Sequence, residues 1–499
     1  MPSLPRSLAK VCVALGFESI DELGHAAEAE YRDGNTLIEI RLDHLRQPQR
    51  GIPWIKQFCA NHADAQVLAT CRHEAHHGRF RGTVEQQIKL LGEAADAGAF
   101  AVDLEVESAE RAKPALVFLR ERAALIVSYH NFDNTPSLEA VMRRLTRIEA
   151  DGCKIATLAR KPSDSLRLIE FLKAPRKTPL VAFAMSEQGF GTRVLSPGYG
   201  GVFTYACPAS SAGTAPGQAP ARLLRTLYHI DKLSRQSKVY GVIGDPVAHS
   251  KSPHIHNRAF QSRRIDSVYL PFLVAQAQLG DWMRVAKQLP VWGFSVTIPN
   301  KQKIMRYLDH IEPLAKRIGA VNTVWRRAGR WRGANTDVDG VVKPLSAHVR
   351  LSHLRVLLAG YGGAARAAAI ALREAGAEVT ITGRDPRRAA LLAKTVAGKS
   401  VPLAAAMKER YAVLVHATPV GMFPECGKCL FPDVVPADLV FDMVYNPRET
   451  ELIQRAKAQG RQVIHGSEMF LEQAAAQFEI WTGETAPRAV MRQALEHEL

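Results

Sequence analysis

Short apolar segments alternate with longer amphipathic ones through the first half of the chain, and this pattern constrains the fold most. The apolar segments carry few polar interruptions: VCVAL, TLIEIRL, QVLATCR, FAVDLEV, ALIVSYH, GCKIATLA, PLVAFAM and GVFTYAC. Stretches with helical spacing, such as TVEQQIKLLGEAADAG from Thr83, separate most of them. Strands of this kind alternating with helices predict a parallel sheet that is buried on both faces.

The number of these units and their combined length indicate a closed (β/α)8 barrel of the TIM type over residues 1–232. One crossover departs from the pattern. The segment SEQGFGTRVLSPGYG, before the last strand, is rich in glycine and has little helical spacing. We therefore expect eight strands but fewer than eight regular helices.

After a polar stretch at residues 229–238 the strand–helix pattern restarts twice. The first restart, VYGVIGDPVAHSKSPHIHNRAF, predicts a separate α/β lobe over residues 237–345. The second, VLLAGYGGAARAAAIALREAGAEVTITGR, reads strand, glycine turn, helix and strand, as in a Rossmann-type nucleotide-binding unit. We expect this cofactor lobe to span residues 346–499, with carboxyl-terminal helices that return to the other lobe.

Composition narrows the class of protein. Seven scattered cysteines indicate reduced thiols, and no leader peptide or apolar run of membrane-spanning length is recognised, so we expect a cytoplasmic protein. The net charge of +16 raises the alternative of nucleic-acid binding. The arginines are spread along the whole chain with no polybasic run, which favours a basic surface that attracts anionic small molecules. The sequence leaves a homo-oligomer open.

Lys154, inside the strand segment GCKIATLA, is the most informative residue of the predicted barrel. Its sequence neighbours are apolar, and desolvation favours the neutral, nucleophilic form of an amine. The alternative is a lysine that extends to the rim of the barrel. Because His130 ends the preceding strand, we interpret Lys154 as an imine former and His130 as the base that assists loss of a β-hydroxyl. Arg41 and Arg193 have the chemistry of a carboxylate clamp.

The segments EIRLDHL, ATCR, VSYHNFDNTP, CKIATLA, GTRVLS and APGQAP resemble, in this order, the type I 3-dehydroquinate dehydratases. The resemblance implies that Lys154 forms a Schiff base with 3-dehydroquinate and that His130 removes its C2 proton, giving 3-dehydroshikimate. The residues that it implies for substrate binding are Glu39, Arg41, Arg72, Met185, Arg193, Thr214 and Gln218.

Two positions depart from that family. His76 occupies the place of a glutamate that helps to orient the base, and an imidazole would not act on His130 in the same way. Thr214 replaces a serine and keeps the hydroxyl. Dehydratase activity is still expected.

In the second half, polar residues recur at predicted strand ends and helix starts. They lie in HSKSP, SVTIPNK, AVNT and GANTDVDG, and each motif alone is also compatible with ordinary turn or cap chemistry. Together they supply Lys301, Asp337 and several neutral hydrogen-bonding groups, a set suited to proton transfer beside hydride transfer.

The predicted cofactor turn is GYGGAAR, from Gly360 to Arg366, which follows a strand and opens a helix. Its backbone can approach a pyrophosphate at the helix amino terminus. At the end of the next strand, TGRDPRR places arginines where an NAD-specific enzyme carries an acidic residue, which favours the 2′-phosphate of NADP. Asp385 lies inside this cluster and leaves NAD as the alternative.

HSKSP, SVTIPNK, GAVNT, NTD, AGYGGAARA, ATPVGM, DMVYNP and GSEMFLEQAA resemble the shikimate dehydrogenases over residues 238–499. The resemblance implies Lys301 and Asp337 as the catalytic pair for reducing 3-dehydroshikimate to shikimate with NADPH. It implies substrate binding by Ser250, Ser252, Thr297, Asn322 and Gln473. The residues implied around the cofactor are Gly360, Gly362, Gly363, Ala364, Arg384, Arg388, Thr418, Tyr445, Gly466 and Met469. Gly383 stands where that family commonly has an asparagine.

Two motifs are interpreted as unrelated to metal. The sequence HEAHH at residues 73–77 contains a formal HExxH, but it follows a strand and enters a loop rather than a helix. Cys426 and Cys429 form a lone CxxC without a second pair of ligands. We therefore expect no metal, and a fused shikimate-pathway enzyme. The alternatives are a catabolic quinate or shikimate dehydrogenase fusion that uses NAD, and a nucleic-acid-binding protein on a retired enzyme scaffold.

Overall fold

The computed structural model describes residues 3–4, 8–211 and 213–498. The expectation that the chain lacks a leader peptide concerns a segment that includes residues 1–2 and 5–7, which lie outside the described residues. The chain divides into two compact units, one of residues 1–239 with 266–290 and the other of residues 240–265 with 291–499.

The first unit contains an eight-stranded parallel sheet in which neighbours follow the chain, in the order β7-β6-β5-β4-β3-β2-β1-β8. Its strands are β1 Val11–Leu15, β2 Leu37–Arg41, β3 Gln66–Thr70, β4 Ala101–Glu105, β5 Ala124–His130, β6 Gly152–Leu158, β7 Leu180–Met185 and β8 Thr204–Ala206. Where β7 and β8 meet, the amide of Val202 donates a 2.9 Å hydrogen bond to the carbonyl of Leu180. The predicted eight-stranded barrel is confirmed.

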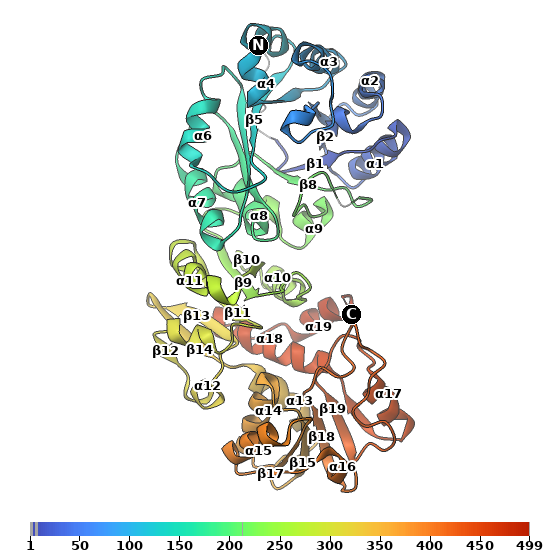
Figure 1. The fold of residues 1–499 in the computed structure, drawn as a ribbon, viewed down its shortest axis with the longest axis vertical. Coiled ribbons are helices and arrows are strands. Elements are labelled where there is room, and N and C mark those ends of the chain that lie inside the picture. Colours follow the sequence, from blue (N-terminus) through green and yellow to red (C-terminus); the bar gives the residue numbers. More distant parts are fainter. Residues whose placement is uncertain (1–2, 5–7, 212, 499) are drawn as a thin grey trace. The chain divides into compact units, whose positions relative to one another are not determined.

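Helices connect the strands on the outside of this barrel (Figure 1). They are α1 Ile20–Arg32, α2 Gly51–Asn61, α3 Val84–Asp96, α4 Val106–Arg111, α5 Leu116–Arg120, α6 Leu138–Leu145, α7 Pro162–Lys173, α8 Phe190–Tyr199 and α9 Ala221–Thr226. The expectation that the seventh crossover lacks a regular helix was wrong, because α8 occupies it. Val194, Leu195 and Tyr199 are buried along α8, and burial of an apolar face outweighs the low helix propensity of glycine.

The second unit begins with a mixed sheet in which β9, β11, β13, β14 and β12 are neighbours in that order. The strands are β9 Lys238–Gly244, β11 Val291–Val296, β12 His310–Ile311, β13 Thr323–Arg327 and β14 Arg330–Ala334, and the helices are α10 Ser252–Ser262, α12 Pro313–Ile318 and α13 Asp337–Ser346. Two further elements, β10 Ser267–Leu273 and α11 Leu279–Gln288, belong to residues 266–290 of the first unit.

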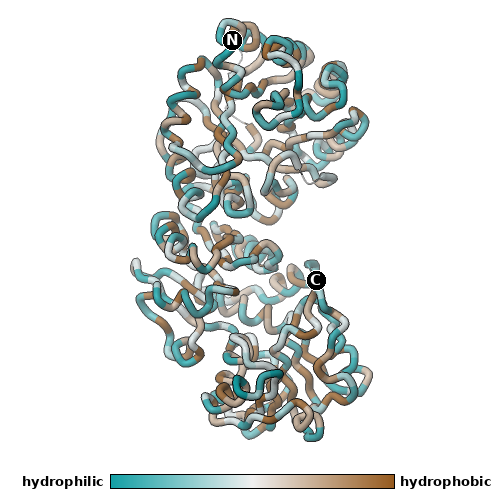
Figure 2. Tube along the Cα trace, viewed as in Figure 1, coloured by the Kyte–Doolittle hydropathy of each residue, from teal (hydrophilic) through white to brown (hydrophobic). Residues whose placement is uncertain are grey.

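A parallel six-stranded sheet follows, in the order β17-β16-β15-β18-β19-β20, and hydrophobic residues run along its central strands (Figure 2). The strands are β15 Arg355–Ala359, β16 Glu378–Thr382, β17 Lys399–Ser400, β18 Tyr411–His416, β19 Ala437–Asp442 and β20 Gln462–Ile464. The helices are α14 Gly363–Glu374, α15 Pro386–Thr395, α16 Leu403–Ala406, α17 Glu451–Ala458, α18 Gly466–Thr482 and α19 Arg488–Glu496. The strand order reverses at β15, which confirms the Rossmann-type arrangement.

Within the second unit α18 packs against α13. No helix in the described part of the chain combines the length and the hydropathy that a membrane-spanning segment requires.

Candidate active sites

Lys154 lies in the interior of the barrel, on β6, with 4% of its surface exposed. Its Nζ donates to Asp103 Oδ2 at 3.0 Å and to the hydroxyl of Tyr205 at 2.9 Å, and it lies 3.5 Å from Glu39 Oε1. The amine of Lys154 is therefore surrounded by polar side chains from other strands and not by the apolar residues next to it in the sequence. The amine is buried, but in a polar cluster.

His130 ends β5, beside the strand that carries Lys154. Ser128 pairs with Lys154 in the register of the two strands. His130 follows Ser128 by two residues and points to the same side of the sheet. Burial, followed by the positive charges of Arg72 and Lys154, lowers the pKa of His130 well below 6.5. The imidazole is therefore neutral at neutral pH and can accept a proton.

The three predicted arginines of the barrel differ in how fully they are paired. Arg41 makes a bidentate ion pair with Asp43, at 3.0 and 2.8 Å, and Arg72 donates to Asp103 at 3.3 Å. Arg193, in α8, is 1% exposed and donates from Nη2 to the carbonyl of Pro216. Its Nε and Nη1 have no hydrogen-bond partner among the described residues. Burial lowers its pKa to about 9, which still leaves the guanidinium charged at neutral pH, and its two unpaired nitrogen groups can receive an anion.

The remaining predicted residues of this site lie at the same ends of the strands. Met185 ends β7 and is buried. Gln218 Oε1 accepts a hydrogen bond from the Thr214 amide at 2.7 Å, and its Nε2 donates to the Thr214 hydroxyl at 3.4 Å. The threonine hydroxyl thus holds the glutamine amide in a fixed orientation.

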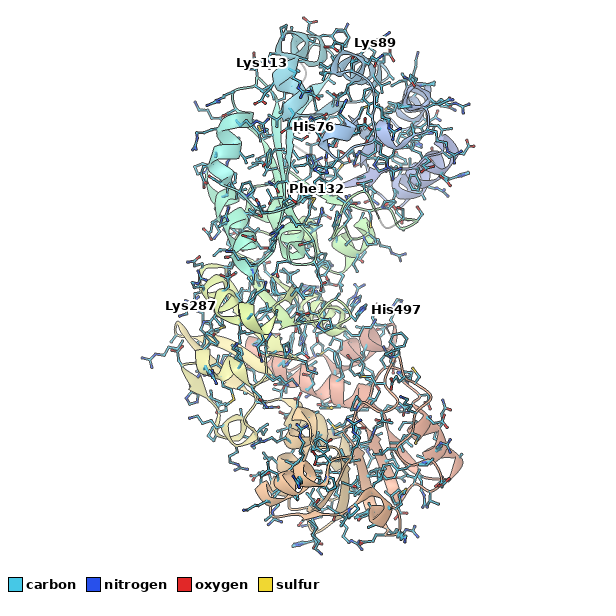
Figure 3. The ribbon with its side chains drawn as sticks, viewed as in Figure 1. His76, Lys89, Lys113, Phe132, Lys287 and His497 are labelled. Atoms are coloured by element: carbon cyan, nitrogen blue, oxygen red, sulfur yellow. The ribbon has the colours of Figure 1, made fainter. Side chains whose placement is uncertain are left out.

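The unusual residue His76 lies in a three-residue 3-10 helix, Glu74–His76, that follows β3 (Figure 3). The neighbouring His77 is the histidine that lies against Phe132, with 4.5 Å between the ring centroids and the two rings tilted, and its charge contributes to the low pKa of His130. His73 contacts the carbonyl of Gly82 through Nε2. The HExxH residues therefore do not share the face of one helix, and no group of three or more potential metal ligands occurs among the described residues.

A second candidate site is a cavity of about 370 Å³ in the second unit. It is lined by the residues that the sequence predicts for catalysis and substrate binding in this half: Ser250, Ser252, Thr297, Lys301, Asn322, Asp337 and Gln473. Four residues predicted for the cofactor also line it: Ala364, Tyr445, Gly466 and Met469. Residues predicted for the substrate and residues predicted for the cofactor thus line the same cavity.

Lys301 and Asp337 form an ion pair at its wall. Lys301 Nζ lies 2.7 Å from Asp337 Oδ2, and Asn322 Nδ2 donates to Asp337 Oδ1 at 2.7 Å. Asp337 is the first residue of α13, where the helix dipole favours its negative charge. Asn322 and the helix start hold the carboxylate in place, so the lysine amine has a fixed position at the cavity.

The glycine turn lies between β15 and α14 as predicted. Gly360 has φ 128°, and a Cβ there would meet the carbonyl oxygen of Ala417 at 2.7 Å, so glycine is required. Gly362 and Gly363 face open space, with no atom within 4 Å of a Cβ built on either. The amino terminus of α14 is therefore open to an anion such as a dinucleotide pyrophosphate.

The arginine cluster after β16 is exposed beside this turn. Arg388 lies over the ring of Tyr361, with 4.9 Å from its Cζ to the centroid. Asp385 accepts hydrogen bonds from the amides of Arg387 and Arg388 and caps α15. The carboxylate of Asp385, which left NAD as an alternative, therefore already accepts hydrogen bonds from the backbone. Arg384 is exposed.

Several residues of these sites were missed by the sequence reasoning. Asp103 and Tyr205 contact the amine of Lys154 directly, and Ser128 donates to Asp103 at 2.6 Å. In the second unit His416 joins Asp442 to the predicted Thr418, at 2.8 and 2.5 Å. The signal that could have revealed Asp103 was present, since an acidic residue in a fully buried strand needs a buried partner.

A barrel with a buried lysine beside a neutral histidine, followed by a Rossmann-type sheet whose open glycine turn borders a polar cavity, defines a two-part lyase and dinucleotide-dependent oxidoreductase. Residues 11–235 match the Type I 3-dehydroquinase family, residues 242–324 the shikimate dehydrogenase substrate binding domain, and residues 466–496 the shikimate 5′-dehydrogenase C-terminal domain. The chain belongs to the bifunctional 3-dehydroquinate dehydratase/shikimate dehydrogenase family.

Three known proteins are similar to this chain. The chloroplastic bifunctional 3-dehydroquinate dehydratase/shikimate dehydrogenase of Arabidopsis thaliana is 34% identical over 96% of this chain and 83% of its own length. The shikimate dehydrogenase (NADP(+)) of Thermosynechococcus vestitus is 41% identical over 54% of this chain and 98% of its own. A crystal structure of shikimate 5-dehydrogenase from Thermus thermophilus with NADP(H) and shikimate is 35% identical over 52% of this chain and 100% of its own, with a TM-score of 0.48.

Proposed function

We propose that the first unit dehydrates 3-dehydroquinate to 3-dehydroshikimate through a Schiff base on Lys154. The observation that carries this proposal is the buried amine of Lys154 on the strand beside His130, whose pKa burial lowers well below 6.5. The neutral amine attacks the substrate ketone, whose oxygen leaves as water, and the resulting imine acidifies the adjacent C–H bond. His130 removes that proton and returns it to the β-hydroxyl, which leaves as water, and hydrolysis of the imine then releases 3-dehydroshikimate and the free amine.

The substrate carboxylate binds to Arg193, since its Nε and Nη1 are unpaired among the described residues. Glu39, Arg72, Thr214 and Gln218 contact the substrate hydroxyls, with Met185 against the ring. Arg41 is already paired with Asp43, so we assign to it the positioning of that carboxylate and only an indirect part in binding.

The second unit reduces 3-dehydroshikimate to shikimate with NADPH. When bound, NADPH supplies the hydride. Lys301 donates a proton to the carbonyl oxygen as it becomes an alcohol, and Asp337 holds Lys301 in place. The ring hydroxyls and carboxylate contact Ser250, Ser252, Thr297, Asn322 and Gln473. Around the cofactor we place Gly360, Gly362, Gly363, Ala364, Arg384, Arg388, Thr418, Tyr445, Gly466 and Met469.

The domain limits stay as the sequence suggests, with the barrel at residues 1–232, the substrate lobe at 237–345 and the cofactor lobe at 346–499. We place the protein in the cytoplasm. Its partners are the small molecules of this reaction sequence rather than nucleic acid, and a homo-oligomer is compatible with them.

The direct test is a single-enzyme coupled assay. The purified chain, given 3-dehydroquinate and NADPH, should consume NADPH and release shikimate, because one chain carries both sites. Quinate with NAD should give little turnover. If 3-dehydroshikimate is reduced but 3-dehydroquinate is not consumed, the proposed role of the barrel is wrong.

Cofactor choice is tested at Arg384 and Arg388. We expect Arg384→Ala with Arg388→Ala to lower kcat/KM for NADPH by roughly 10- to 100-fold, the loss of charge-assisted hydrogen bonds to a phosphate, and to leave the low activity with NADH unchanged. Arg373→Ala is the matched control, because Arg373 lies in the last turn of α14, away from the glycine turn. It should change kcat/KM for neither cofactor. Equal losses with both cofactors would contradict recognition of the 2′-phosphate.

A further inference from the structure

Tyr205 connects the amine of Lys154 to a carboxylate in the barrel interior. It lies in the middle of β8, is 3% exposed, and its ring centroid lies 4.0 Å from Lys154 Nζ. Its hydroxyl accepts a hydrogen bond from Lys154 Nζ at 2.9 Å and donates one to Glu39 Oε1 at 3.2 Å. The bonds form a directed chain from ammonium through hydroxyl to carboxylate.

We propose that Tyr205 is a further catalytic residue of the dehydratase, which carries a proton from Lys154 to Glu39 before the amine attacks the substrate. An N–H bond of the Lys154 ammonium breaks as an O–H bond forms on Tyr205. The original O–H bond of Tyr205 breaks as an O–H bond forms on Glu39. The result is a neutral amine, a neutral tyrosine and a protonated carboxyl group, so atoms and charge balance. The inference rests on the proposed role of Lys154.

The geometry favours this route over direct transfer. Lys154 Nζ and Glu39 Oε1 are 3.5 Å apart, beyond the usual N–H···O range, and the tyrosine hydroxyl bridges them. Glu39 also accepts a 2.7 Å hydrogen bond from Thr70, which holds the carboxylate toward the chain of bonds. Burial, followed by the charge of Glu39, raises the pKa of Tyr205 well above 10. Tyr205 therefore stays protonated at rest and acts by exchanging one proton for another.

Asp103 is the other carboxylate in contact with Lys154, and its charged partners keep it ionised. Although burial opposes the effect, Lys154 and Arg72 hold the pKa of Asp103 below its usual value. Ser128 and Arg72 also donate hydrogen bonds to its Oδ1. Asp103 thus remains ionised and fixes the position of the amine.

The test is Tyr205→Phe in the full-length chain, which keeps the ring and removes the hydroxyl. The measured quantity is the rate at which 3-dehydroquinate forms an adduct that borohydride can trap, followed from pH 6 to pH 9. We expect the rate to fall by about 100-fold at neutral pH, the scale of one lost proton-transfer group. The deficit should shrink as pH rises, because hydroxide then takes the proton from Lys154.

Tyr199→Phe is the matched control, since Tyr199 is also buried in the barrel unit and its hydroxyl has no partner among the described residues. It should leave the trapping rate unchanged. Near-ultraviolet circular dichroism and the thermal midpoint report whether the barrel stays folded. If Tyr205→Phe traps at the wild-type rate, or more slowly by the same factor at every pH, proton transfer through Tyr205 is refuted. If the wild-type chain itself traps no adduct, the Schiff-base function fails and the inference falls with it.

Discussion

Lys154→Ala should lower the rate of 3-dehydroquinate dehydration by on the order of 10⁴-fold or more and abolish the borohydride-trapped adduct. Without the amine no imine forms, and the C–H bond that His130 attacks loses its acidity. A neighbouring group cannot replace the nucleophile, because the described residues that contact the amine are two carboxylates and a tyrosine, and none of these forms an imine. Mass spectrometry of the reduced adduct and a continuous assay of 3-dehydroshikimate formation measure both effects.

The same change should destabilise the barrel, because it leaves Asp103 and Glu39 buried without their shared counter-ion. Breaking a buried ion pair by removing one partner costs about 3–5 kcal/mol. Lys89→Ala, on the exposed face of α3 (Figure 3), removes a lysine without any of these contacts and is the matched control. Reduction of added 3-dehydroshikimate by the Lys154→Ala chain should persist. Adduct formation by a folded Lys154→Ala chain would contradict the assignment.

One property of parallel sheets allowed the sequence to place His130 and Lys154 on neighbouring strands. Chain order fixes the neighbours of each strand in a barrel, so residues at consecutive strand ends meet at one rim. His130 ends β5 and Lys154 lies within β6, and these two strands are paired in the structure.

Chain order does not determine which side chains contact one another inside the barrel. Arg41 was expected to bind a substrate carboxylate, yet it is engaged by Asp43 two residues later. Lys154 was expected among apolar groups, yet Asp103 and Tyr205 reach it from strands β4 and β8. Such contacts depend on rotamers and on strands distant in sequence, which local patterns do not encode.

The helix α8 and the helix cap at Asp385 are two further features that the sequence analysis did not predict. Glycine and proline in α8 favour other conformations, but burial against the barrel decides the outcome. In the sequence Asp385 left NAD as an alternative, because an acidic residue can bind a ribose hydroxyl. In the structure Asp385 is the N-cap of α15, a position that aspartate prefers.

Lys301→Met should lower kcat for NADPH-dependent reduction of 3-dehydroshikimate by roughly 10²- to 10⁴-fold, the range for loss of a general acid. Lys301 Nζ is the cation held 2.7 Å from Asp337 at the wall of the cavity, so its removal leaves the developing alkoxide without a proton donor. Asp337→Asn should give a smaller loss, since the lysine remains but is less firmly held. Steady-state NADPH oxidation measures kcat, and fluorescence titration shows whether NADPH still binds.

A second lysine–aspartate pair, on α13, provides a control that distinguishes loss of the proton donor from loss of a positive charge. Lys343 Nζ lies 3.0 Å from Asp339 Oδ1 on the exposed side of the same helix that Asp337 begins. Lys343→Met removes an equivalent charge away from the cavity and should keep the wild-type kcat. Dehydration of 3-dehydroquinate by either variant should be unchanged, since the barrel carries its own site. A Lys301→Met chain that binds NADPH and turns over at the wild-type rate would show that the proton comes from elsewhere.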